Sequence, residues 1–200
     1  RTLETGYSSL ASSDFHEGLT RLLPPDSLYL GRKAVNIDAT GVTLNDGTQL
    51  DARVVVDARS FQPSKHLRGG WQVFMGRHMR LEDAHGIDRP VIMDADVEQL
   101  APYGNGGAYR FVYVLPLAAH DVFIEDTYYA DDAKLDRAAL SGRIDQYARD
   151  NGWHDGTPVG HEAGLLPVLT GGDFNAYQND VRVPGVVVIG ARGGFTHPLT

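Results

Sequence analysis

Two apolar runs determine how this chain folds: YRFVYVLPL at residues 109–117 and VFIEDTYY at residues 122–129. Aromatic and branched residues fill both runs, which is typical of strands on a pleated, largely buried surface. The runs are separated by Ala118, Ala119, His120 and Asp121. The pattern therefore predicts an antiparallel hairpin with a four-residue loop, in which Leu117 pairs with Val122.

Glu125 lies inside the second run and is the residue there with the clearest chemical use. Successive side chains of a strand point to opposite faces, so Glu125 and Asp126 cannot share an environment. The expected pairing places Glu125 opposite Val114. Its face then also carries Val112, Pro116, Phe123, Thr127 and Tyr129. Desolvation among such neighbours raises the pKa of a carboxyl, as a general acid requires. The pattern leaves a second reading open, a solvated charge at the rim of the sheet.

Composition bounds the kind of protein. A chain of 200 residues with 42% hydrophobic content can form one domain or two small ones. Its net charge of −8, without a basic stripe, argues against nucleic-acid binding. The absence of cysteine excludes a disulfide framework and a thiol nucleophile. The chain begins with Arg1 and ends in a Gly-rich stretch, so we expect a piece of a longer polypeptide.

Apolar strands near both ends frame a different middle region. Residues 54–57 and 186–189 are apolar without alternation, which is typical of strands buried on both faces of a parallel sheet. Strands at 71–81, 90–94 and 161–169 and a helix at 135–150 fill the middle. We predict an α/β domain at residues 1–61, an inserted antiparallel domain at 62–172 and a return to the first domain at 173–200. A capped helix is expected from Ser12 or Ser13 to about Leu23, with an apolar stripe made of Phe15, Leu19, Leu22 and Leu23.

Three further expectations follow from local pattern. Alternation at Val35 and Ile37 and at Val42 and Leu44 predicts two strands, with a turn at Asn45-Asp46-Gly47. The helix at 135–150 is expected to bury Leu140, Ile144, Tyr147 and Ala148. A flexible loop is expected at residues 103–107.

Few motifs in the chain indicate chemistry by themselves. The Gly-rich turn from Gly190 to Gly194 follows a predicted strand, so it is either a phosphate cradle or an ordinary turn. No G-x-G-x-x-G fingerprint occurs. His161 and Glu162 begin like a zinc-protease motif, but Leu165 replaces the second histidine and Pro167 forbids the helix. No metal site is therefore expected, and Glu162 is either a solvated strand-edge charge or a partner of Glu125.

Several blocks, in order, resemble bacterial members of the flavoprotein lycopene cyclase family. They are TLETGYSSLASSDFH, VVVDAR, GWQVFMGRH, PVIMDA, YRFVYVLPL with FIEDTYY, HEAGLLPV-TGGDF and IGARGGFTHPLT, which together extend from Thr2 to Thr200. The resemblance implies a FAD-binding α/β fold, like that of flavoprotein hydroxylases, with an inserted antiparallel substrate domain. It also implies closure of the ends of lycopene to β-rings, through γ-carotene to β-carotene. This reaction has no net redox change, but needs reduced FAD with NAD(P)H as electron donor.

The same resemblance assigns roles to residues. It implies that Glu125 is the catalytic acid and that Glu162 contributes to removing the proton. The implied substrate-binding residues are Trp71, Phe123, Thr127 and Tyr129. The implied cofactor-binding residues are Asp57, Arg59, Gly190, Arg192, Gly193 and Gly194. Two positions depart from the pattern: Ser60 stands where the family usually has glycine, and Ala191 stands where the broader flavoprotein group has an aspartate.

The implied partners are lycopene and a membrane surface, with peripheral attachment on the cytoplasmic side. Without the glycine fingerprint, the 200-residue chain alone is expected to bind FAD poorly and to be inactive. Two other functions remain open. One is a flavin-dependent hydroxylase or isoprenoid reductase of the same fold, and the other is a non-catalytic carrier of an apolar ligand. An acid in a dry pocket favours the cyclase, because neither alternative needs one.

Overall fold

The structure is a computed structural model that describes residues 6–100 and 108–196. Contacts divide the chain into two compact units, Arg1–Asp57 with Val183–Val187 and Ala58–Arg182 with Val188–Thr200. These divisions differ from the predicted boundaries at residues 61 and 172. The assignment of cofactor and substrate domains stays a prediction. The two units are described separately.

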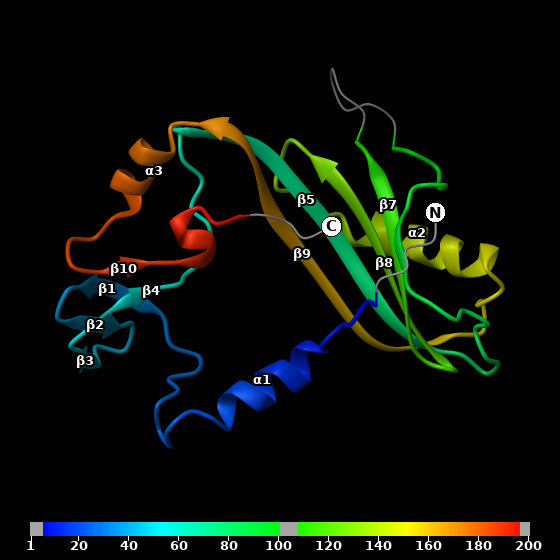
Figure 1. The fold of residues 1–200 in the computed structure, drawn as a ribbon, viewed down its shortest axis with the longest axis horizontal. Helices are drawn as coiled ribbons and strands as arrows, with labels where there is room; N and C mark the ends of the chain where they lie inside the picture. Colours follow the sequence, from blue (N-terminus) through cyan, green and yellow to red (C-terminus); the bar gives the residue numbers. More distant parts are fainter. Residues whose placement is uncertain (1–5, 101–107, 197–200) are drawn as a thin grey trace. The chain divides into compact units, whose positions relative to one another are not determined.

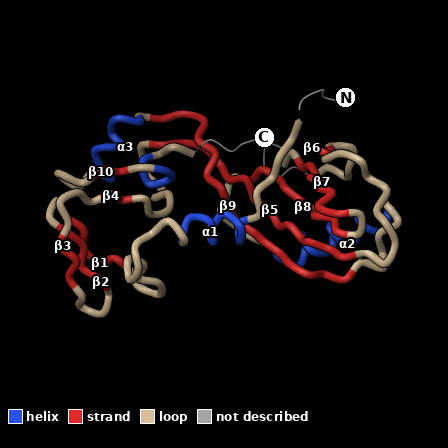
Figure 2. The backbone as a smooth tube through the Cα atoms, turned by 60° about the horizontal axis from the view of Figure 1, so that its bottom comes forward, coloured by secondary structure: helices blue, strands red, loops and turns tan. Residues whose placement is uncertain are grey.

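The first unit is built from short strands, and its three-stranded sheet is antiparallel. Its three-stranded sheet has the order β1-β2-β3, and β4 pairs with β10 in a two-stranded ladder (Figures 1 and 2). The unit also holds α1. The bounds are α1 Ser12–Thr20, β1 Ala34–Asp38, β2 Gly41–Leu44, β3 Gln49–Asp51, β4 Val56–Asp57 and β10 Val187–Val188. β1, β2 and the turn at Asn45–Gly47 lie where the sequence predicts them, but the burial does not alternate, because Val35 is 57% exposed while Ile37 is partly buried.

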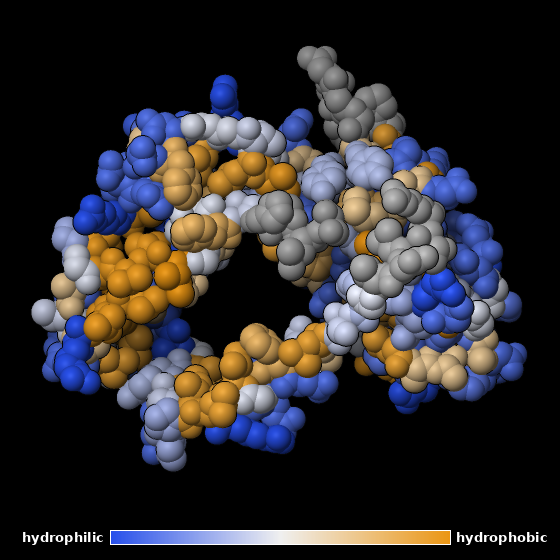
Figure 3. Space-filling view, in the orientation of Figure 1, coloured by the Kyte–Doolittle hydropathy of each residue, from blue (hydrophilic) through white to orange (hydrophobic). Residues whose placement is uncertain are grey.

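Two expectations for this unit are wrong. The predicted strand at residues 54–57 is not buried on both faces, because Val54 is 68% exposed and Val55 only 5%. The helix α1 begins after Ala11 without a side-chain cap and ends at Thr20 rather than Leu23. Its predicted apolar stripe is exposed throughout. Figure 3 shows the resulting gathering of apolar side chains at the surface of this unit. Val55 and Asp57 are buried while Val54 and Val56 are exposed, so the ladder is covered on one face only.

The second unit is organised around a five-stranded antiparallel sheet with the order β6-β7-β8-β5-β9 (Figure 1). The predicted strands of the middle region are confirmed, and two of them begin four residues earlier than expected, at Leu67 and Thr157. The bounds are β5 Leu67–Arg80, β6 Val91–Asp94, β7 Arg110–Ala118, β8 Asp121–Ala130 and β9 Thr157–Gly172. The unit is completed by α2 Arg137–Asp150, α3 Phe174–Val181 and the short 3₁₀ helix η1 Gly190–Gly193. The predicted loop at residues 103–107 lies outside the described residues.

The core of this unit lies between the sheet and α2. The side chain of Asp136 caps α2 by accepting a hydrogen bond from the N–H of Ala139. Leu140, Ile144 and Ala148 form the buried stripe, as the sequence predicts. They face a fully buried strand surface made of Val112, Val114, Val122 and Ile124. Each such side chain contributes about 1.5–3 kcal/mol to stability by burial, so this face is the stable frame of the unit.

A β-bulge changes the register of the predicted hairpin. Ala118 pairs with Asp121 next to a two-residue turn, but Pro116 pairs with Val122. Leu117 is therefore the extra residue on β7. Proline has no N–H to donate to a ladder, and bulges are where strands accommodate it. The predicted four-residue loop, with Leu117 opposite Val122, is wrong.

This shift by one residue exchanges the two faces of β7. Glu125 pairs with Tyr113, not with Val114. The neighbours of Glu125 on β7 are therefore aromatic: Phe111 and Tyr113 lie on its face, while Val112 and Val114 face α2. The position of Glu125 on the face of Phe123 and Thr127 does not depend on the hairpin loop and follows from alternation along β8 alone.

Candidate active site

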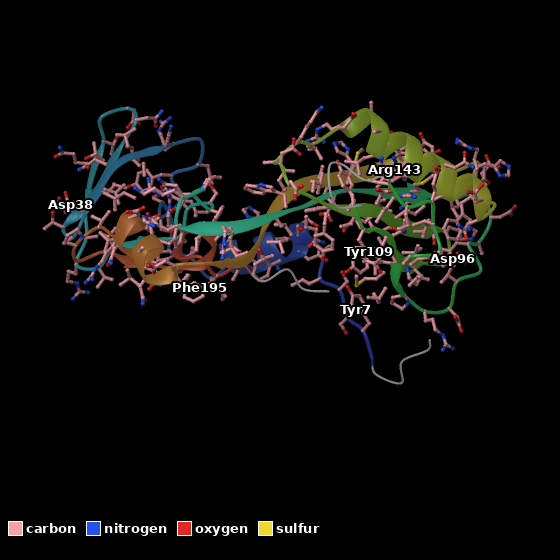
Figure 4. All side chains as sticks on the ribbon, turned by 90° about the horizontal axis from the view of Figure 1, so that it is seen from above. Tyr7, Asp38, Asp96, Tyr109, Arg143 and Phe195 are labelled. Atoms are coloured by element: carbon pink, nitrogen blue, oxygen red, sulfur yellow. The ribbon has the colours of Figure 1, made fainter. Side chains whose placement is uncertain are left out.

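The two faces of the five-stranded sheet differ in covering. Arg77 of β5 donates to Ser141 of α2 at 2.5 Å and is paired with Asp145, so α2 covers the face of Arg77. The other face carries Glu125. Figure 4 shows Tyr109 and Arg143, the latter on α2, on opposite sides of the sheet. The candidate site is the face opposite α2.

Aromatic rings surround Glu125 on this face. Tyr113 is its direct partner on β7, and Phe123 lies two residues before it on β8. The ring of Phe111 lies between those of Tyr113 and Tyr129, with centroid distances of 5.4 Å and 6.1 Å. Phe111 is fully buried and Glu125 is partly buried. The carboxyl group therefore sits at the edge of a continuous aromatic surface.

This environment changes the acidity of Glu125. Burial is the largest cause and raises the pKa of Glu125 to about 7, with further increases from the charges of Glu162 and Asp126. Thr127 opposes them, because its hydroxyl donates to Oε1 of Glu125 at 2.8 Å and stabilises the carboxylate. The direction agrees with the sequence prediction. A carboxyl with such a pKa keeps its proton to a higher pH than an ordinary glutamate does, as a general acid requires.

Glu162 lies in the same row of the sheet. Gly76 of β5 pairs with Glu125 of β8 on one side and with Glu162 of β9 on the other. Directly paired residues in a sheet point to the same face, so both carboxyl groups rise above Gly76. The structure thus brings the two predicted catalytic residues together. Their roles stay predictions.

Asp126 has the opposite environment. Only 1% of it is exposed, and it lies between two arginines on the face covered by α2. Arg110 donates through Nε to Oδ2 of Asp126 at 2.7 Å, and Arg143 donates through Nε to Oδ1 at 3.1 Å. The guanidinium of Arg143 also lies 5.2 Å from the centre of the Tyr128 ring. Asp126 is therefore a structural anion that holds α2 on the sheet.

The predicted substrate residues divide between the two faces. Phe123, Thr127 and Tyr129 share the face of Glu125 by alternation along β8. Trp71 pairs with Ala130 and lies on the other face, where its ring contacts Phe61 at a centroid distance of 6.1 Å. The structure does not bring Trp71 to Glu125.

A cavity of about 760 Å³ lies elsewhere in the second unit. It is formed between the N-terminal end of α2 and the adjoining ends of β5, β8 and β9. Its lining includes Trp71, Tyr128, Asp136 and Arg143. Glu125 and Glu162 do not line it. The cavity is therefore separate from the candidate acid.

The Gly-rich turn predicted to bind the cofactor packs against aromatic side chains. A Cβ at Gly194 would lie 2.6 Å from the Phe174 ring, and one at Gly193 would lie 2.9 Å from the Phe195 ring. The hydroxyl of Tyr177 donates to the carbonyl of Arg192 at 2.9 Å. These contacts explain two of the glycines by packing within the protein.

The backbone donors of the same turn are also largely engaged. The N–H groups of Gly193, Gly194 and Phe195 donate to the carbonyls of Ile189, Ala191 and Gly190. Gly190 differs, since a Cβ there would meet nothing within 4 Å and its φ is +57°. Asp57 is buried in the first unit, whereas Arg59 belongs to the second unit and is exposed. The assignment of these residues to FAD stays a prediction.

Sequence reasoning missed the residues that shape the site across strands. A Cβ at Gly76 would lie 2.1 Å from Cζ of Phe123, so this ring lies over Gly76. A Cβ at Gly164 would lie 2.7 Å from the Phe74 ring in the same way. A glycine inside a strand is a signal of such close approach. Tyr113 was missed because the bulge at Leu117 was not foreseen.

The site is thus a carboxyl group with a raised pKa on an aromatic sheet face. The family described as lycopene cyclase protein matches residues 1–200. The chain belongs to this family.

The curated relatives that match are lycopene β-cyclases. The protein from Paracoccus sp. (strain N81106 / MBIC 01143) is 38% identical over 200 residues, which are 100% of this chain and 49% of that protein. The proteins from Pantoea ananas and Pseudescherichia vulneris are each 36% identical over all of this chain, which covers 50% of each. The chain thus spans about half the length of these relatives.

One solved structure shows a distant likeness. It is a geranylgeranyl bacteriochlorophyll reductase-like protein from Thermoplasma acidophilum, with a TM-score of 0.46 and 14% identity over 83% of this chain and 41% of that chain. A likeness at this level supports no functional assignment. Among the described residues, no helix has the length and apolarity that a membrane crossing requires. The same residues contain no group of three potential metal ligands.

Proposed function

We propose that this chain carries the catalytic acid of a lycopene β-cyclase, which closes the acyclic ends of lycopene into β-rings. The observation that carries the proposal is Glu125, a partly buried carboxyl among aromatic rings whose pKa is raised to about 7. The relatives with this name support the choice of substrate. Neither a reductase nor a carrier of apolar ligands requires an acid at this position.

The chemistry begins with transfer of a proton from Glu125 to the terminal double bond of lycopene. A new carbon–carbon bond then closes the ring, and a proton leaves a ring carbon as the ring double bond forms. One proton enters and one leaves, so there is no net redox change and the enzyme is an intramolecular lyase, or isomerase. The rings of Tyr113 and Phe123 would stabilise the intermediate cation by about 0.5–2 kcal/mol each. Exclusion of water by the aromatic face protects that cation.

The resemblance to flavoproteins adds a cofactor to this proposal. Reduced FAD, with NAD(P)H as electron donor, is expected in the full-length protein, and when bound it would supply negative charge to stabilise the cation. Gly190, Arg192, Asp57 and Arg59 remain the residues proposed to contact it. The steps assigned above to Glu125 and its neighbours do not depend on its placement.

A membrane surface is part of the same proposal. Lycopene is an apolar molecule that resides in lipid, so we propose peripheral attachment of the full-length protein to the cytoplasmic side of the membrane. Flotation of the full-length protein with liposomes, reversed by mild detergent, is the expected result. Absence of flotation with every lipid composition would contradict peripheral attachment and leave the acid assignment standing.

The decisive experiment is Glu125→Gln in the full-length protein. Glutamine keeps the shape of the side chain and has no proton to transfer at neutral pH. General acid catalysis contributes about 10²–10⁴-fold to rate, so β-carotene formation from lycopene with reduced FAD should fall by at least that range. Glu82→Gln, at an exposed position after β5, is the matched control and should keep full activity.

Folding must be checked in the same samples, by circular dichroism and by FAD content. Near-normal turnover of a folded Glu125→Gln variant would refute the assignment of the acid. A folded, inactive variant beside an active Glu82→Gln variant supports it.

A further inference from the structure

The row formed by Glu125, Gly76 and Glu162 connects a sheltered carboxyl to solvent. Glu125 is partly buried, whereas Glu162 is exposed. Gly76 lies between them on the central strand and contributes no side chain. The two carboxyl groups therefore face each other across a single glycine on one face of the sheet.

The two groups are coupled as well as adjacent. After burial, which is the largest cause, the charge of Glu162 and a hydrogen bond with its side chain both raise the pKa of Glu125. A hydrogen bond between two carboxyl groups requires one proton, because two carboxylates have only acceptors. The sheltered Glu125 favours the neutral form, so its O–H donates and the exposed Glu162 accepts.

We propose that Glu162 is a proton relay, which returns a proton from solvent to Glu125 after each ring closure and holds Glu125 in its donating form. This role rests on the proposed function. Glu125 loses a proton to the double bond in each ring closure, so a proton must reach Glu125 before the next one. Glu162 is the carboxyl adjacent to Glu125 that is open to solvent.

Other ionisable groups on this face are engaged differently. His78 lies 2.8 Å from Oδ1 of Asp121 through Nε2, and Arg80 donates to the same oxygen. His78 and Arg80 lie two and four residues after Gly76 on β5, where they pair with Phe123 and Asp121. The Phe123 ring lies over Gly76 and separates this cluster from Glu125. By alternation along the described strands, and at Tyr109 just before β7, the ionisable groups on the face of Glu125 are Arg68, His78, Arg80, Tyr109, Tyr113, Asp121, Tyr129 and Glu162. On the opposite face, Asp126 adds a charge that also raises the pKa of Glu125.

The test uses the full-length protein with lycopene and reduced FAD, and compares Glu162→Gln, Glu162→Asp and Glu82→Gln. The rate is measured against pH, both in the first turnover and in the steady state. Glu162→Gln removes a charge and a hydrogen bond that keep Glu125 protonated, so the alkaline limb of its profile should move to lower pH. At neutral pH its steady-state rate should fall by about tenfold or more, as expected when an acid–base group is lost.

The first turnover should be affected less than the steady state at a pH below the alkaline limb, because Glu125 then starts with its proton. Glu162→Asp restores the charge and should recover part of the shift. Glu82→Gln should match the unsubstituted protein. A purely structural role of Glu162 would lower both rates without moving the alkaline limb.

The outcomes separate the relay from the proposed function. A Glu162→Gln variant with an unchanged alkaline limb and an unchanged steady-state rate overturns the relay, while an inactive Glu125→Gln variant still supports the acid. Full activity of Glu125→Gln overturns the proposed function itself. Glu162 is exposed, so its substitution leaves the core of the unit intact. If Glu162→Gln nevertheless fails to fold, the pH profile of Glu162→Asp is compared with that of Glu82→Gln. Identical profiles would then overturn the relay.

Discussion

Glu125 and Asp126 are consecutive carboxylates on one strand, and the sheet gives them opposite properties. Asp126 is enclosed on the α2 face and is neutralised by Arg110 and Arg143. Glu125 is less buried, yet it lies among aromatic rings beside a second carboxyl and has a pKa raised to about 7. Depth of burial alone therefore does not decide protonation. The partners differ: Asp126 accepts hydrogen bonds from Arg110 and Arg143, whereas burial among aromatic rings, with the charge of Glu162 added, raises the pKa of Glu125.

Of all substitutions around these two carboxylates, removal of the Asp126 charge is expected to lower the stability of the fold most. Asp126→Asn leaves Arg110 and Arg143 without their anion in a buried setting, which is expected to destabilise the fold by about 3–5 kcal/mol. Urea unfolding of the full-length protein measures this loss. Asp88→Asn, at an exposed loop position, is the control and should change stability by less than about 0.5 kcal/mol. A stable Asp126→Asn variant would show that this ion pair does not hold α2 on the sheet.

The second prediction concerns stability against pH. Because the pKa of Glu125 is about 7 in the folded protein, against an ordinary value of 4.5, the folded protein binds the extra proton between these pH values. Stability is therefore expected to fall as pH rises from about 4.5 to 7, by at most about 3 kcal/mol for this group. Glu125→Gln should flatten this part of the profile and be more stable than the unsubstituted protein above pH 7. Parallel profiles for the two proteins would contradict the raised pKa.

The third prediction tests the glycine between the carboxyls. Gly76→Ala places a Cβ 2.1 Å from Cζ of Phe123, so the ring must move. Overpacking of this kind costs about 1–3 kcal/mol, and the displaced ring should also lower cyclase activity. Gly142→Ala is the control: it lies in α2 with nothing within 4 Å, and should stabilise by about 0.5–1 kcal/mol. Thermal unfolding of both variants compares them, and equal effects would mean that the ring does not lie over Gly76.

The smallest expected effect is that of Thr127→Val. Valine keeps the volume of this fully buried side chain and removes the hydroxyl that donates to Glu125. Loss of one hydrogen bond costs about 0.5–1.5 kcal/mol. Since this bond lowers the pKa of Glu125, its loss should move the alkaline limb of the rate profile to higher pH, opposite to Glu162→Gln. A limb that moves in the same direction in both variants would contradict the electrostatic account.

Much of the second unit was predictable because its information is local. Alternation along β8 places Glu125 and Asp126 on opposite faces whatever they pair with. The stripe of Leu140, Ile144 and Ala148 specifies which side of α2 is buried, although the cap at Asp136, which begins the helix two residues after the predicted start, was not foreseen. The ordered blocks of sequence that resemble the lycopene cyclase family indicate the family by themselves, and the family match confirms it.

The pairing between strands was decided only by the tertiary structure. The bulge at Leu117 depends on how Pro116 is accommodated beside Val122, and it replaces Val114 by Tyr113 opposite Glu125. The contact of Glu125 with Glu162 joins segments 37 residues apart through β5, and no periodicity within either segment specifies it. The exposure of apolar residues in α1 and β4 was likewise not predictable from their local sequence. A sequence shows that a face is apolar, but what covers that face depends on neighbours that are distant along the chain, since burial is a property of packing between elements.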